Sequence, residues 1–168
     1  MPHEPEWYPL VSEALVRGLG LDPVLLHAQV QFRDGSIADF VYVERARVVV
    51  FEVKMAEVGE VAAPLDGRAQ RQLRHFCAAA DEVYVVTVGV PQLFAWTTDG
   101  RVEPRPQVEP QLLPPGVGWI VFDPFGRAVS TLRQAGRLDP KPDDRRQLVE
   151  TVTARLARAV RAVESCRV

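Results

Sequence analysis

The stretch that decides the fold is residues 37–54, IADFVYVERARVVVFEVK. It holds two runs rich in β-branched and aromatic residues, joined by a short charged turn at residues 44–47, and this pattern predicts two consecutive strands. The second run is apolar at nearly every position, as in a strand that is buried on both faces. These two strands therefore carry Asp39, Glu52 and Lys54 into the middle of an apolar sheet.

The charged residues within these strands indicate a function. Successive side chains of a strand point to opposite faces, so Glu52 and Lys54 share one face. Burying a carboxylate and an ammonium group costs free energy unless the two are paired or bind a metal ion. Only two of the twenty basic residues are lysines, Lys54 and Lys141, and the pKa of a lysine, unlike that of an arginine, shifts readily with its surroundings. The alternative is a Glu–Lys pair with a purely structural role, since such pairs also occur in cores.

Length and composition set the class of protein. A chain of 168 residues predicts one domain, spanning residues 1–168. The apolar content of 47% and the charged content of 25% are typical of a soluble globular protein. No apolar run approaches the roughly 20 residues of a membrane span, and the acidic N-terminus lacks the features of a signal peptide. Cys77 and Cys166 are far apart and lack metal-ligand spacing, so we expect a protein of the reducing cytoplasm without a disulfide framework or zinc site.

The charge is distributed unevenly along the chain. The net charge is −2, but residues 127–168 hold ten basic and five acidic residues, a net charge of +5, so the first 126 residues carry −7. A basic C-terminal third can follow a phosphate backbone. It can equally be the solvated face of an ordinary helix, and the composition does not separate these two interpretations.

Hydrophobic periodicity predicts the order of the elements. Helices are predicted at residues 6–19, 66–80 and 143–165, and strands at residues 25–32, 37–43, 47–54, 82–88, 117–122 and 128–132. Asp34-Gly35 predicts a hairpin turn. The segment 47–88 forms a βαβ unit with parallel strands. The proline-rich residues 91–116 are mostly loop, with one short strand at 93–97. The predicted fold is an α/β domain with a mixed central sheet flanked by helices, in the order α-β-β-β-α-β, followed by a C-terminal β-hairpin and helix.

Two carboxylates on neighbouring strands, facing one cleft, suit a hard divalent cation. Mg²⁺ (or Mn²⁺) prefers oxygen ligands and keeps several waters. Such an ion lowers the pKa of a bound water and stabilises charge that builds on a phosphate. Lys54, on the same face as Glu52, can hold or deprotonate the attacking water, or contact the phosphoryl oxygens.

The spacing of these residues resembles the signature of the PD-(D/E)XK nuclease superfamily. Asp39 is followed thirteen residues later by Glu52-Val53-Lys54, and the predicted element order resembles the restriction-endonuclease-like core of that superfamily. The residue before Asp39 is alanine instead of proline. Many members carry a glutamine on the next helix in a Q-x-x-x-Y pattern. Gln72 matches it, with Phe76 in place of the tyrosine, and is therefore preferred to Gln70.

Many members, Holliday-junction resolvases among them, also place a glutamate on the first helix. Glu13 fits that order, although it lies roughly opposite the centre of the apolar stripe of residues 6–19. The alternatives to these two roles are a solvated surface glutamate at position 13 and an exposed polar residue at position 72.

A closer resemblance is to the MmcB-like family of bacterial DNA repair proteins, and it runs from about residue 28 to 160. It is carried by these segments: Ala38-Asp39, Glu52-Val53-Lys54, Phe76-Cys77, Asp81-Glu82-Val83-Tyr84, residues 115–121 (PGVGWIV) and Arg145-Arg146. That family has a glutamate on the strand before the motif aspartate, where this chain has Gln29. The difference concerns one metal ligand, so weakened or absent catalysis stays an alternative.

The resemblance implies a Mg²⁺- or Mn²⁺-dependent DNA phosphodiesterase that acts in DNA repair or processing. Asp39 and Glu52 would bind the metal together with the carbonyl of Val53, and Lys54 would orient the water. Gln72 would contact the site or a phosphate, and further contacts with the DNA backbone would come from Arg68, Arg71 and Arg74.

No motif that reads base sequence is present, so we expect structure-directed or nonspecific cutting. A homodimer and a repair-protein partner are left open. Two other hypotheses are a DNA-binding repair accessory without turnover, and a protein-interaction module in which Asp39, Glu52 and Lys54 form a structural ion network.

Overall fold

A six-stranded mixed sheet forms the centre of the protein. The computed structural model describes residues 4–55, 65–88, 94–96, 102–104 and 113–167. The sheet has the strand order β1-β2-β3-β4-β7-β8. Its strands are β1 (Leu26–Gln31), β2 (Ile37–Glu44), β3 (Arg47–Lys54), β4 (Glu82–Val88), β7 (Gly118–Asp123) and β8 (Ala128–Arg133). The α-helices are α1 (Tyr8–Leu19), α2 (Gly67–Cys77) and α3 (Pro142–Ser165), and short 3₁₀ helices cover Glu4–Trp7 and Pro23–Leu25.

The directions of the strands confirm the predicted fold class. β1, β2 and β3 form an antiparallel meander. β3 and β4 are parallel, with α2 between them in the chain, as the βαβ prediction required. β7 is parallel to β4, and β8 returns antiparallel to β7. The chain is therefore an α/β protein with the element order predicted from its hydrophobic pattern, including the C-terminal hairpin and helix.

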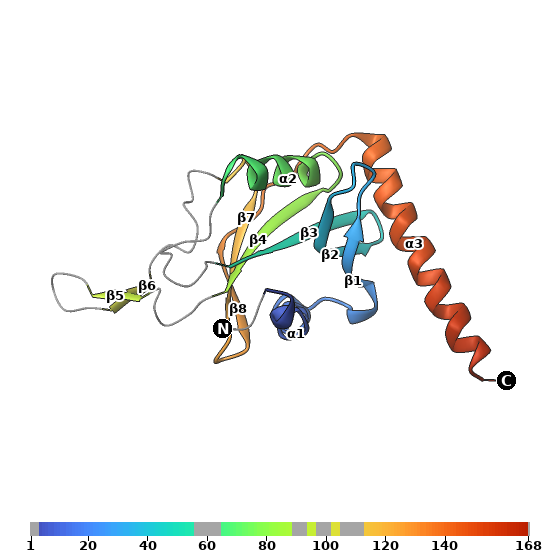
Figure 1. Ribbon diagram of the computed structural model, residues 1–168, viewed down its shortest axis with the longest axis horizontal. Coiled ribbons are helices and arrows are strands. Elements are labelled where there is room, and N and C mark those ends of the chain that lie inside the picture. The colour runs from blue at the N-terminus through green and yellow to red at the C-terminus, as the bar shows by residue number, and fades with distance from the viewer. Residues whose placement is uncertain (1–3, 56–64, 89–93, 97–101, 105–112, 168) are drawn as a thin grey trace.

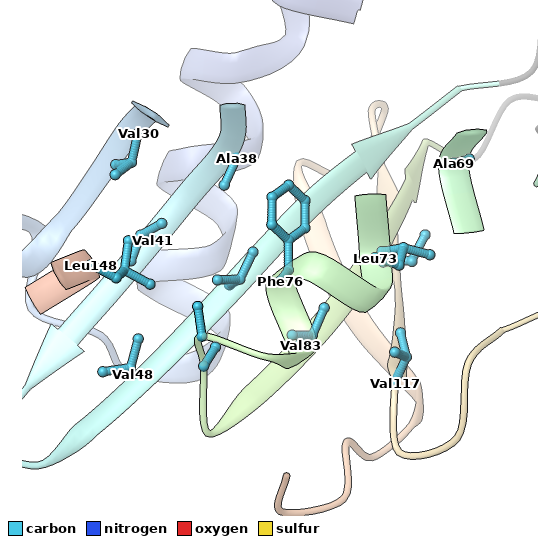
Figure 2. Packing of buried hydrophobic residues seen from close by; sticks show 14 of the residues in the cluster. Val30, Ala38, Val41, Val48, Ala69, Leu73, Phe76, Val83, Val117 and Leu148 are labelled. Atoms are coloured by element: carbon cyan, nitrogen blue, oxygen red, sulfur yellow. The ribbon is translucent and has the colours of Figure 1, made fainter. Parts of the chain in front are cut away.

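Helices cover both faces of the sheet. In Figure 1, α1 and α2 lie on opposite sides of the strands. On the α2 face, Leu73 and Phe76 pack into a cluster with valines of β3 and β4, part of which Figure 2 shows. On the α1 face, Val11 and Leu15 pack against a second cluster that includes Phe40 and Phe51. Burial on both sides explains why residues 48–53 are apolar apart from Glu52.

Local sequence signals explain where these elements begin and end. Gly20 adopts a left-handed conformation (φ 64°) and ends α1, which suits a residue without a Cβ. Asp66 caps α2 by accepting a hydrogen bond from the backbone N–H of Ala69 at 2.9 Å, the usual role of an aspartate at that position. Gly35 (φ 88°) sits in the predicted turn between β1 and β2.

The last helix differs from its prediction. Apolar residues recur along it at helical spacing, at Leu148, Val152, Leu156, Ala159 and Val163, and this pattern predicts one buried stripe. Leu148 and Val152 are buried, Leu156 is half-buried, and Ala159 and Val163 are exposed. Figure 1 shows the second half of α3 extending away from the sheet. An apolar stripe predicts an amphipathic helix, but it does not predict that the sheet is wide enough to cover the whole of that helix.

The proline-rich segment contains one more strand than expected. β5 (Phe94–Trp96), which falls within the predicted strand, pairs antiparallel with β6 (Val102–Pro104). β6 was not predicted because Pro104, which cannot donate a backbone hydrogen bond, argues against a strand. The rest of the loop prediction for residues 91–112 lies outside the described residues. Among the described residues, no helix has the length and apolar character needed to cross a membrane.

Candidate metal centre

The two candidate carboxylates lie where the pairing of β2 and β3 changes. Regular pairing of β2 with β3 runs from Glu44 and Arg47, beside the turn that joins the two strands, to Phe40 and Phe51, which lie opposite each other. At the next position, the backbone N–H of Asp39 donates to Glu52 Oε2 at 3.3 Å, and the N–H of Val53 donates to Asp39 Oδ2 at 2.7 Å. Each carboxylate thus reaches across to the other strand, and both residues are buried. The two strands bring the acidic groups predicted from residues 37–54 into one site.

Lys54 and Gln72 extend the site toward α2. Lys54 Nζ lies 3.3 Å from Glu52 Oε1 and 3.4 Å from Gln72 Oε1, and the Lys54 side chain is 20% exposed. Gln72 Nε2 also donates to the carbonyl of Ile37 at 3.4 Å. Gln70, the less favoured candidate, donates to the carbonyl of Leu65 instead. The structure therefore joins Gln72, and not Gln70, to the carboxylates through Lys54.

Glu13 does not join the site. Its side chain is 61% exposed and forms an ion pair with Arg17 at 2.8 Å. The buried face of α1 is made by Val11, Ala14 and Leu15, and Glu13 points away from it. The prediction of Glu13 as a site residue is therefore wrong, and the alternative interpretation, a solvated surface glutamate, describes it correctly.

Tyr8 takes the place on α1 that Glu13 was expected to fill. Its hydroxyl donates to Asp39 Oδ1. Gln29 Nε2 donates to the same oxygen at 3.3 Å. Sequence reasoning missed Tyr8, although a signal existed. Tyr8 lies three residues before Val11 and seven before Leu15, on the buried face of the helix, and a buried tyrosine hydroxyl usually finds a hydrogen-bond partner.

We predict that Tyr8→Phe will weaken Mn²⁺ binding roughly tenfold, because groups that orient a ligand carboxylate contribute to metal affinity. Tyr84→Phe is the matched control, since the Tyr84 hydroxyl bonds to Gln134 on a different part of the sheet. Isothermal titration calorimetry with Mn²⁺ measures both variants. Equal affinities of Tyr8→Phe and Tyr84→Phe would show that the Tyr8 hydroxyl has no part in the site.

The site holds more acidic groups than basic ones, Asp39 and Glu52 against Lys54. Burial, followed by the neighbouring charge of Asp39, raises the pKa of Glu52 to about 8, while Lys54 acts in the opposite direction. Two buried carboxylates beside a single ammonium group cannot both ionise without cost. A divalent cation would relieve this cost, which is the first reason that the residues fit a metal.

The available ligand atoms are the second reason. Asp39 Oδ2 and both Glu52 oxygens each accept one hydrogen bond, so each keeps a lone pair for a cation. In the part of the chain that the structure describes, no group of three or more His, Cys, Asp and Glu side chains is placed to hold a metal. These side chains would therefore supply no more than two ligands to an ion bound here. Two carboxylates, the carbonyl of Val53 and waters would suit Mg²⁺, which retains several waters when bound.

Three predicted DNA contacts lie on the outside of α2. Arg68, Arg71 and Arg74 are all exposed. They share this helix with Gln72, so the basic surface and the carboxylates belong to neighbouring parts of the fold. Their side chains take no part in the hydrogen bonds of Asp39, Glu52 and Lys54 described above.

Comparison with known proteins supports the fold alone. No family model matches the chain, and no curated protein matches it. A solved structure described as the SPO1766 protein of unknown function from Silicibacter pomeroyi is similar, with a TM-score of 0.60 and 15% sequence identity. The likeness covers 99% of this chain and 96% of that one. The chain therefore shares its overall α/β architecture with a protein whose own description names no activity.

Proposed function

We propose that the protein is a metal-dependent DNA phosphodiesterase of the PD-(D/E)XK type that acts in DNA repair or DNA processing. The observation that carries this proposal is that each carboxylate accepts a backbone N–H of the other strand, Glu52 from Asp39 and Asp39 from Val53, with Lys54 bonded to Glu52. A purely structural Glu–Lys pair explains the contact of Lys54. It does not explain a second buried carboxylate that raises the pKa of the first.

The residues divide the work of hydrolysis between them. A bound Mg²⁺ or Mn²⁺ ion would supply positive charge beside the phosphate and a water of lowered pKa. Asp39 and Glu52 would hold that ion, together with the carbonyl of Val53. Lys54 would orient the attacking water, accept its proton or contact a phosphoryl oxygen. Gln72 acts through Lys54, since its Oε1 accepts a hydrogen bond from the ammonium group.

Exposed cations on and near α2 suit a phosphate backbone. Arg68, Arg71 and Arg74 are exposed on α2. Arg74 also lines a surface cavity of about 580 Å³ together with Arg33 and Lys141. Two acidic residues, Asp34 and Asp144, line it as well, and His75 pairs with Asp34. Cations spread over such a surface support contacts with DNA that are independent of sequence, and hence structure-directed or nonspecific cutting.

One observation favours a second candidate, a DNA-binding repair accessory with weak or absent turnover. Gln29 Nε2 donates to Asp39 Oδ1, at the position where the resembled family has a glutamate. An amide there supplies a hydrogen-bond donor to the carboxylate instead of another negatively charged ligand. A site with two carboxylates would bind a divalent cation less tightly than a site with three.

Cleavage assays separate these candidates. Purified protein is incubated with plasmid, single-stranded and branched DNA in Mg²⁺, Mn²⁺ or EDTA. We expect cutting that depends on the metal and that falls by roughly 10²-fold or more in Asp39→Asn, because a lost ligand removes several kcal/mol of charge stabilisation. Asp143→Asn, at an exposed carboxylate on α3, should cut at the wild-type rate. Binding of DNA without cutting would favour the accessory protein, and equal cutting by wild type and Asp39→Asn would exclude this site.

A further inference from the structure

Gln29 has an unusual backbone for a residue inside a strand. Its φ angle is 54°, in the left-handed region that non-glycine residues rarely adopt. The other non-glycine residues with positive φ in the described chain, Arg45 and Arg127, lie in hairpin turns. Gln29 instead lies in the middle of β1, opposite Asp39 of β2, between the paired positions Ala28 and Val30. Such a conformation persists only where surrounding contacts hold it.

Arg155 of α3 provides such contacts. Its Nη1 donates to the carbonyl of Ala28, and its Nη2 donates to the carbonyl of Gln29 at 2.7 Å. Successive carbonyls of a regular strand point in opposite directions, so one side chain can bind both only where the backbone turns between them. β1 is an edge strand, which leaves these carbonyls accessible to the helix. The planar guanidinium donates to two acceptors in a fixed geometry that lysine cannot reproduce.

The same residue connects this backbone to the candidate metal centre. While Arg155 holds the main chain of Gln29, the Gln29 side chain donates to Asp39 Oδ1 at 3.3 Å. The chain of contacts is therefore short and continuous, from the α3 guanidinium to the β1 backbone, then to the Gln29 amide and the Asp39 carboxylate. Its two ends are hydrogen bonds between named atoms, and the covalent structure of Gln29 joins them.

We infer that Arg155 is a positioning residue for the metal centre. By fixing the left-handed backbone of Gln29, it aims the Gln29 amide at Asp39 and so orients a metal-binding carboxylate from a helix that does not itself reach the site. This inference rests on the proposed function for its effect on metal binding. Its structural part, the control of Gln29 by Arg155, stands separately.

The first measurement follows the Gln29 side chain without any metal. The ¹H–¹⁵N resonances of its side-chain amide report the hydrogen bond to Asp39. We expect them to move toward free-amide positions in Arg155→Ala and to stay in place in Arg158→Ala, an exposed arginine three residues further along α3. Arg155→Lys keeps the charge but lacks the forked geometry, so its Gln29 resonances should resemble those of Arg155→Ala. The lysine variant also serves as a second test if the alanine variant is unstable. Unchanged Gln29 resonances in either Arg155 variant would overturn the inference.

The second measurement is the affinity for Mn²⁺ by calorimetry. Arg155→Ala should weaken binding roughly tenfold, as expected for loss of a group that orients a ligand. Gln29→Gly accepts the positive φ but has no amide, and should weaken binding equally. In the Gln29→Gly background, Arg155→Ala should have no further effect, because its path to Asp39 is already removed. Additive losses in the double variant, or wild-type affinity in Arg155→Ala, would contradict the inference. If the wild-type protein binds no Mn²⁺, the proposed function fails, and the amide resonances still decide whether Arg155 controls Gln29.

Discussion

Lys54→Ala should abolish most DNA cleavage while leaving Mn²⁺ binding in place. The ammonium group lies 3.3 Å from Glu52 Oε1 and would act on the attacking water, so its loss should lower the rate roughly 10²- to 10⁴-fold, the usual contribution of a positioned acid or base. The removal of a cation beside the carboxylates should not weaken metal binding once Glu52 is ionised. Cleavage rates and calorimetric Mn²⁺ affinities at about pH 9 measure the two effects separately.

Two further variants sharpen this result. Arg17→Ala removes an exposed cation of α1 that lies outside the basic surface on α2, and should cut at close to the wild-type rate. Lys54→Arg keeps the positive charge but cannot give up its proton, so it should stay inactive if Lys54 accepts the proton of the water. A parallel loss of cleavage and of Mn²⁺ affinity in Lys54→Ala would show that Lys54 acts on the fold or the metal and not on the water.

Glu52→Gln should make the metal-free protein more stable at alkaline pH. The folded pKa of Glu52, about 8, lies above its ordinary value of 4.5. The folded protein therefore keeps a proton that the unfolded chain releases, and the stability from this group is complete below about pH 4.5 and falls as the pH rises to about 8. The slope in that window approaches about 1.4 kcal/mol per pH unit. Glutamine cannot ionise, so thermal melts in EDTA should diverge from wild type as the pH increases.

The same variant distinguishes a metal site from a structural ion network. Above pH 8, Mn²⁺ should raise the melting temperature of the wild type and leave that of Glu52→Gln unchanged, because ligands that bind only the folded state stabilise it. Glu13→Gln, at an exposed glutamate, should behave like the wild type. If Glu52→Gln is the less stable protein at every pH and Mn²⁺ stabilises neither form, the buried charges serve the fold, as the protein-interaction hypothesis requires.

The fold could be predicted in detail because its strongest signals are local. Residues 47–54 and 82–88 were predicted as strands with the same bounds that the structure has, since runs of β-branched residues between polar turns leave few alternatives. The turn at Asp34-Gly35 was predicted, but the register of β1 and β2 does not follow from it. Counting outward from a two-residue turn at residues 34–35 places Val30 opposite Asp39, whereas the turn spans residues 33–35 and the pairing is shifted by one residue, which brings Gln29 opposite Asp39.

The remaining parts of the site depend on contacts between distant segments. Tyr8 is 31 residues from Asp39 in sequence, and Arg155 is 126 residues from Gln29. Helical periodicity shows which face of its helix each residue occupies, but it does not show which residue of the sheet the side chain meets, because that depends on how the helix packs. Arg155 does fall seven residues after Leu148, on the buried side of α3, but an arginine there is equally consistent with a side chain that reaches solvent. The left-handed backbone at residue 29 could not be predicted either. A glycine is the usual sign of such a conformation, and this position holds a glutamine.

The central claim is that Asp39 and Glu52 together bind a divalent cation, and titration calorimetry with Mn²⁺ at about pH 9 tests it most directly. That pH lies above the pKa of Glu52, about 8, so a proton competes only weakly with the metal. We predict that the wild type binds a single Mn²⁺ ion and that Asp39→Asn and Glu52→Gln each remove this binding while remaining folded. Absence of binding by the wild type, or wild-type binding by both variants, would contradict the account.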